Sequence, residues 1–185
     1  MADIVGIDKS LRVPGRLCAD PTGISSFPHG GIDLGEALRV ELVPSQSVRP
    51  IIAEEYGGEA VDYIIRNQEV SLVCLMRGFP TEMMRRVWPG GSGSGATAKV
   101  NYPGAGAADR GYLGSTRSFK ILFSPQDTVN HCGIILYEAV PLFTETSQMQ
   151  AMVTEELGMA VVLRGLRRAS DEKVAEVARL SSISL

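Results

Sequence analysis

Apolar and polar residues alternate one by one in several short runs, and this period of two constrains the fold more than any other feature of the chain. In residues 38–42, and again in residues 119–123, an apolar residue occupies every second position. Successive side chains of a β-strand point to opposite faces, so such runs are typical of strands with one buried face. The sequence therefore predicts a fold built mainly from strands.

Other apolar runs extend this prediction over most of the chain. Strands are expected near residues 48–54 and 61–66, with a turn at 67–69 after them. The run VSLVCLM at 70–76 is apolar on both faces, which favours a central strand covered on both sides. Residues 134–143 and 159–163 are further apolar runs, for a total of six to eight strands.

Helical periodicity is confined to two short segments. Residues 79–88, FPTEMMRRVW, place apolar residues four apart and begin with a proline suited to a first helical turn. Residues 170–180 fit a second short helix capped by Ser170. No regular alternation of strands with long helices is present. We therefore expect a mainly β fold, an antiparallel β-sandwich or part-open barrel with one or two short α-helices.

Glycine and proline cluster in two segments of the sequence. Residues 1–36 contain repeated Pro and Gly and are expected to form an extended N-terminal arm, with a short strand at 13–19. Residues 89–117 are dominated by Gly, Ser and Ala, which predicts a long loop that cannot bury enough apolar area to fold alone. The rest, residues 37–185, is expected to be a single β-sandwich domain.

The residue types that catalysis and metal binding need are scarce. The chain has two histidines and three widely spaced cysteines, so neither a metal cluster nor a disulfide framework is indicated. The Gly-rich run at 90–100 lacks the Lys-Ser/Thr end of a phosphate loop. The formal net charge of −3 does not favour nucleic-acid binding. We expect no enzyme activity, no catalytic residue, no metal and no cofactor.

The chain begins with a polar and charged stretch, and it contains no apolar run long enough for a membrane span. These observations predict a protein that is made and folded in the cytoplasm without a membrane anchor.

An ordered series of local patterns resembles the N-terminal half of phage tail tube proteins and related tail proteins. The series covers residues 13–90 and comprises GRLCADPTG, FPHGGIDLG, ALRVELVPSQSV, RPIIAEEYGGE, AVDYIIRNQEVSLVCLMRGF and WPG. The long insert at 89–117 departs from that family. It leaves open whether the chain is the tube subunit or a relative, such as a baseplate or adaptor ring.

The resemblance implies a structural virion protein. Such proteins form homohexameric rings that stack into a hollow tail tube, through which DNA passes without specific binding. The implied partners are further copies of the chain and other tail proteins, namely the tape measure, terminator, baseplate or sheath. The implied location is the phage tail in the virion, after assembly in the host cytoplasm.

Three groups of residues are candidates for assembly. The first comprises loop residues for ring stacking: Gly90, Gly93, Val100, Tyr102, Tyr112 and Leu113. The second comprises contacts of the arm: Leu11, Val13 and Phe27. The third is an alternating polar face that would line the lumen: Arg39, Glu41, Asp62 and Arg66.

Three alternatives remain open from the sequence. The first is another ring-forming virion or secretion component with the same fold. The second is a monomeric β-sandwich module that binds a ligand under a Gly-rich lid. The third is an enzyme whose site the sequence does not reveal.

Overall fold

Most of the described strands of this protein form one large antiparallel sheet. The computed structural model describes residues 14–52, 59–78, 80–87, 91–92, 97, 99–100, 118–142, 149–150, 158–168, 170 and 172–185. The sheet contains eight strands in the order β10-β7-β6-β1-β2-β3-β9-β8. The N-terminal half contributes β1 (Gly15–Ala19), β2 (Ile32–Ile52) and β3 (Ala60–Arg77). The C-terminal half contributes β6 (Phe119–Pro125), β7 (Gly133–Leu142), β8 (Met149–Gln150), β9 (Gly158–Gly165) and β10 (Ala175–Ala178).

An additional pairing between β7 and β9 closes the sheet into a barrel. Residues Ala139–Leu142 of β7 pair with Val162–Gly165 of β9. The ring therefore runs through β1, β2, β3, β9, β7 and β6 and returns to β1. Closure removes the free edges that an open sheet would present to other chains. The mainly β class predicted from the alternating pattern is confirmed.

Two apolar clusters hold the barrel together. The first contains side chains of every barrel strand, including Leu17, Leu72 and Phe123, which are fully buried. The second lies on the other side of β1, β6 and β7, where Leu180 and Ile183 of the C-terminal segment cover Leu122. That segment includes the 3-10 helix η5 (Leu180–Ser182).

The predicted helix at 79–88 is confirmed as α2 (Thr81–Val87), which follows β3 directly. Its apolar side places Met83 and Val87 in the first apolar cluster. Glu82 in the first turn and Arg85 in the last turn form an ion pair of 2.7 Å. This charge order also matches the helix dipole. The short strands β4 (Gly91–Ser92) and β5 (Lys99–Val100) form a separate two-stranded sheet.

The second predicted helix is wrong. Residues Ala175–Ala178 form strand β10, which pairs with Ile134 and its neighbours on the free edge of β7. A turn precedes β10, in which Glu172 has a positive φ of 63° and its N–H donates to the Arg168 carbonyl. Strand pairing gives hydrogen-bond partners to the backbone groups of both β10 and the adjacent edge of β7. A helix here would form hydrogen bonds only within itself and would leave that edge of β7 unpaired.

The N-terminal segment expected to form an arm enters the sheet at Gly15. β1 lies between β6 and β2, and Leu17, Cys18 and Ala19 are fully buried. The predicted short strand in this segment is therefore confirmed, and the described residues 14–36 belong to the barrel or to the loop against it. The side chains of Leu17 and Leu34 are fully buried, which the high Pro and Gly content of this segment did not indicate. Residues 1–13 lie outside the described residues.

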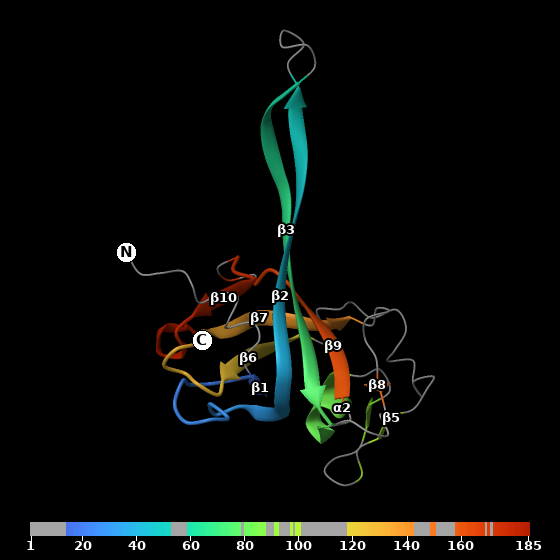
Figure 1. Ribbon diagram of the computed structural model, residues 1–185, viewed down its shortest axis with the longest axis vertical. Coiled ribbons are helices and arrows are strands. Elements are labelled where there is room, and N and C mark those ends of the chain that lie inside the picture. Colours follow the sequence, from blue (N-terminus) through green and yellow to red (C-terminus); the bar gives the residue numbers. More distant parts are fainter. Residues whose placement is uncertain are drawn as a thin grey trace.

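Four strands were expected between residues 37 and 77, but the structure has two long strands there. β2 spans 21 residues and β3 spans 18, and they pair from Ala37↔Met76 to Ile52↔Ala60. The turn expected at 67–69 is wrong, because Asn67–Glu69 pair with Ser45–Ser47 inside the ladder. Figure 1 shows the two strands projecting far beyond the barrel.

Candidate functional site

The projecting part of the hairpin is a two-stranded β-ribbon, defined here as residues 43–52 of β2 and 60–70 of β3. β1 pairs with β2 only at residues 32–37, and β9 pairs with β3 only at residues 71–77. In the part of the chain that the structure describes, no third strand pairs with the ribbon. A two-stranded ribbon in water has little intrinsic stability, so its apolar surface and free edges need a partner.

Large apolar side chains are exposed on both faces of the ribbon. Residues directly paired across two strands share a face. Val48 pairs with Ile65 on one face, and these side chains are 52% and 55% exposed. Ile64 pairs with Arg49 on the opposite face and is 48% exposed. Further exposed apolar residues of the ribbon are Val43, Ile51, Ile52 and Tyr63. Exposed apolar surface of this extent on one element marks an interaction site.

The two edges of the ribbon differ in their hydrogen-bonding groups. Pro44 and Pro50 lie in β2, opposite Val70 and Tyr63 of β3. A proline has no N–H, so it is accommodated in a strand where the backbone nitrogen points away from the partner strand. The outward edge of β2 therefore lacks a backbone N–H donor at Pro44 and at Pro50. In an antiparallel ladder the residues opposite these prolines also direct their backbone groups outward, so β3 offers N–H donors at its edge.

Three of the four charged residues predicted to line a lumen lie on one side of the β2–β3 pair. Arg39 and Glu41 form an exposed ion pair. Arg39, Glu41 and Ile51 are separated by even numbers of residues along β2, so they face the same side, and Ile51 pairs with Asp62 of β3. Asp62 accepts a hydrogen bond from the Tyr63 N–H at 2.7 Å. Arg66 lies at the register shift of β3, between residues 65 and 67. Their role at a lumen stays a prediction.

Most of the predicted loop and arm residues lie outside the described residues, namely Gly90, Gly93, Tyr102, Tyr112, Leu113, Leu11 and Val13. Val100 is described as part of β5, where it pairs with Gly91. Phe27 is described as well, and it lines a cavity on the barrel.

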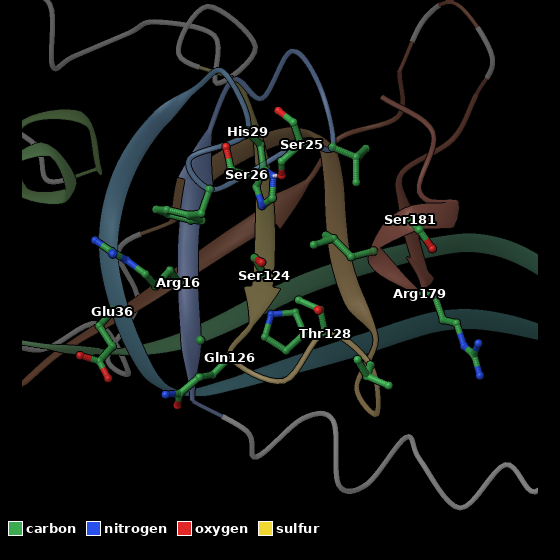
Figure 2. A pocket seen from close by; sticks show the side chains of 16 residues that line it. Arg16, Ser25, Ser26, His29, Glu36, Ser124, Gln126, Thr128, Arg179 and Ser181 are labelled. Carbon is green, nitrogen blue, oxygen red and sulfur yellow. Dashed lines mark hydrogen bonds between the residues drawn. The ribbon is translucent and has the colours of Figure 1, made fainter.

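The cavity has a volume of about 880 Å³ and is named here the His29 cavity. It lies between the 24–29 loop, the start of β1, Glu36 of β2, the end of β6 with the following turn, and residues 179–181. Figure 2 shows Ser124 near its centre, with His29 above it and Gln126 below it in the view. Figure 2 also shows Arg179 on the side formed by the C-terminal segment.

Two buried cysteines of the barrel have raised pKa values. Burial raises the pKa of the Cys18 thiol to about 11, with a smaller contribution from the Asp33 carboxylate. Burial also raises the pKa of Cys74. A raised pKa keeps a thiol protonated at neutral pH, so both cysteines are poor nucleophiles and poor metal ligands. Hydrogen bonds from Asn130 lower the pKa of exposed Asp127 and hold the turn after β6.

Metal-ligating residues are not gathered together. Within the described ranges, no group of three or more His, Cys, Asp or Glu side chains could hold a metal ion. Likewise, none of the helices described for this chain is long and apolar enough to cross a membrane.

The sequence interpretation missed the ribbon as a continuous element. The available signal was the run Tyr63-Ile64-Ile65, because consecutive apolar residues in a strand make both faces apolar. It also missed His29 and Arg179, which lie 150 residues apart and have no shared sequence motif.

Comparison with known proteins gives few matches. No protein-family model matches the chain, and no curated protein matches it. One solved structure of similar shape is a chain of the anti-feeding prophage (AFP) baseplate, determined by cryo-EM with 6-fold symmetrisation. The TM-score is 0.45 and the identity 13%, over 92% of this chain and 95% of that chain.

Proposed function

We propose that this chain is a structural, non-enzymatic subunit of a phage-like tail, and that copies of it assemble into rings through the β-ribbon. In the finer form of the proposal, the rings are hexameric and stack into a tail tube that conducts DNA. This form follows the resemblance of residues 13–90 to tail tube proteins.

The observation that carries the proposal is the exposure of apolar side chains on both faces of the ribbon. Ile52 and Tyr63 are each 59% exposed, and contiguous exposed apolar surface is rare on monomeric proteins. Burying an apolar side chain of this size contributes about 1.5–3 kcal/mol. Seven such residues on one element supply a substantial driving force for association.

The unequal edges of the ribbon favour a ring over a two-fold dimer. The β3 edge offers backbone donors, whereas the β2 edge lacks them at Pro44 and Pro50. Pairing of the β3 edge of one copy with the β2 edge of the next continues the antiparallel order. Such head-to-tail contacts use different surfaces on each partner and generate closed rings when the rotation closes.

The charge pattern is compatible with a channel for DNA. The side of the hairpin that carries Arg39, Glu41 and Asp62 contains charges of both signs, and the chain as a whole has a formal charge of −3. Neutral to acidic surfaces do not bind the phosphate backbone, because binding requires a basic patch. A lumen lined by such residues would let DNA pass without gripping it.

The test is negative-stain electron microscopy of the purified chain at high concentration, beside the double variant Ile51→Lys, Ile64→Lys. We expect rings or hollow tubes from the natural sequence. The double variant should stay monomeric, because two charges would have to be buried between neighbouring ribbons. The matched control is Val177→Lys on β10, where the valine is 42% exposed, close to the 41% of Ile51.

The outcomes separate the forms of the proposal. Stacked rings or tubes support a tube subunit, and single rings that do not stack support an adaptor or baseplate ring. A natural chain that remains monomeric at every concentration, even with preformed assemblies added as seeds, would reject self-assembly. Equal assembly of the double variant and the control would reject the ribbon as the interface.

A further inference from the structure

The His29 cavity contains a buried polar atom without a partner. His29 is 2% exposed, and its Nδ1 lies 2.7 Å from the carbonyl oxygen of Ser25. A carbonyl only accepts hydrogen bonds, so Nδ1 carries the hydrogen, and Nε2 of the neutral ring is a lone-pair acceptor. Among the described residues, Nε2 has no hydrogen-bond partner. Figure 2 shows the His29 ring reaching from its loop toward Ser124, near the centre of the cavity. A ligand that brings a donor there stabilises this acceptor.

The charged groups around the cavity are already engaged or directed elsewhere. Arg16 forms an ion pair with Asp33, and Glu36 pairs with Arg77 at 3.2 Å. Figure 2 shows the side chain of Arg179 directed away from the cavity. A charged ligand would therefore be buried without a free counter-charge among these described residues, which is costly. The lining favours a neutral ligand.

The remaining walls are apolar and partly aromatic. Ile24, Phe27 and Leu180 line the cavity. The rings of Phe27 and His29 pack edge to face, with centroids 5.5 Å apart and an angle of 77° between their planes. The guanidinium of Arg16 lies 4.7 Å from the centre of the Phe27 ring. Aromatic rings pack favourably against one another in such arrangements, and a rigid ring loses little conformational entropy on binding. These walls therefore favour a flat aromatic ligand over a flexible chain.

We propose that the His29 cavity binds a neutral aromatic small molecule with an N–H or O–H group on its ring, as in an indole or a phenol. The ring packs against Phe27, and its N–H or O–H donates to Nε2 of His29. The volume of about 880 Å³ lies within the usual range of ligand pockets, roughly 300–1,000 Å³. Further polar groups of the ligand are in reach of Ser124 and Thr128. The proposal does not depend on self-assembly, because the residues that line the cavity lie outside the ribbon.

The first experiment compares two isomers that have the same size and differ in the donor. Skatole carries its methyl group on a ring carbon and keeps the N–H, whereas N-methylindole has no N–H. Ligand-observed NMR titration measures the affinity of each for the full chain. We expect skatole to bind about fivefold more tightly, which is the usual effect of one hydrogen bond to a buried acceptor. Failure of skatole to bind saturably would overturn the proposal, and so would equal affinity of the two isomers.

The variant His29→Phe tests whether this preference comes from Nε2. Phenylalanine keeps an aromatic ring of similar size and removes the acceptor. We expect the preference for skatole over N-methylindole to disappear. The variant also loses the hydrogen bond to Ser25, but a resulting change in the loop affects both isomers alike, so the comparison between them stays informative. A preference that persists in this variant would overturn the role of His29.

A spectroscopic readout does not require that variant to fold. The chain carries isotopically labelled histidine together with Ile51→Lys and Ile64→Lys, which lie outside the cavity and keep it monomeric. Skatole at saturation should change the nitrogen chemical shift of His29 Nε2, because its lone pair then accepts a hydrogen bond, whereas N-methylindole should change it much less. The variant His131→Gln removes the other histidine of the chain and so assigns the resonance. Equal shifts with the two isomers would overturn the hydrogen bond.

Two substitutions to tryptophan locate the ligand. Thr128→Trp, an exposed change at the mouth, should block binding of skatole, whereas Val177→Trp, an exposed change on β10 outside the lining, should not. Equal affinity of the two variants for skatole would overturn the assignment to this cavity. The compound N-acetyltryptophanamide carries the same ring within a peptide-like backbone. If it binds more tightly than skatole, the cavity accepts a tryptophan side chain of a protein partner, which would overturn the assignment to a small molecule.

Discussion

Gly35 occupies a backbone conformation that other residues avoid. Its φ is +108°, and a Cβ atom at this position would lie 2.5 Å from Cγ of Pro80. Gly35 is therefore the point at which β2 passes closely over the residue that precedes α2. In the sequence this glycine is one of twenty, and nothing in the local pattern distinguishes it from the others.

Gly35→Ala is expected to destabilise the chain by about 1–3 kcal/mol, because the left-handed conformation and the contact with Pro80 both oppose a side chain. Gly23→Ala is the control, since a Cβ there meets nothing within 4 Å and its φ is not in the positive range. Denaturant unfolding followed by circular dichroism measures both variants. Equal midpoints would show that the structure at Gly35 adapts without cost.

The elements differ in how far the sequence determines them. The strand at Phe119–Pro125 and the helix at Thr81–Val87 follow from local periodicity. The helix expected at 170–180 fails because β7 has a free edge that pairs with this segment. That edge is a tertiary feature and leaves no local signal. The same applies to the His29 cavity, whose lining comes from five separate segments.

The β2–β3 hairpin shows a further limit of local patterns. Pro44 and Pro50 suggest breaks between short strands, but both fit an edge whose backbone nitrogens face outward. The run at 70–76 was expected to be covered on both sides. Leu72 and Cys74 are fully buried, but Leu75 on the other face is 39% exposed. The sequence thus predicts the strand, while the uncovered face appears only in the structure.

Two residues of β3 are expected to contribute very differently to the free energy of unfolding. Leu72 belongs to the first apolar cluster, whereas Ile64 on the same strand is outside both clusters. In dilute monomer, Leu72→Ala should cost about 2–5 kcal/mol of unfolding free energy. Ile64→Thr should change it by less than about 0.5 kcal/mol, because no core contact is lost. Chemical denaturation checks both, and a large loss for Ile64→Thr would show that the ribbon packs on the barrel.

At the scale of the whole molecule, the protein is a closed barrel from which the two-stranded ribbon of β2 and β3 projects. Closure through β7 and β9 pairs the barrel strands on both sides, whereas no third strand among the described residues pairs with either edge of the ribbon. Proteins usually protect such edges with charges, prolines or bulges. Here β2 has two prolines, whereas β3 from Tyr63 to Val70 has no proline but contains the register shift at Arg66 and the charged residue Glu69. The two edges are therefore protected by different means, and they differ in that the β2 edge lacks N–H donors at its prolines.

This asymmetry gives a prediction about assembly that is independent of side-chain exposure. Tyr63 lies opposite Pro50, so its N–H faces outward, and a neighbouring strand would replace the Asp62 carboxylate that accepts from it in the single chain. Tyr63→Pro removes that donor without removing a hydrogen bond between β2 and β3. We expect a folded monomer with an unchanged circular dichroism spectrum but at least tenfold weaker association by sedimentation velocity.

Tyr63→Thr, which keeps the N–H and loses the ring, is the matched control. If assembly depends on edge pairing, the threonine variant associates more strongly than the proline variant. If the two variants associate equally, the neighbouring copies meet through the faces of the ribbon, and the prolines of β2 serve only to protect its edge.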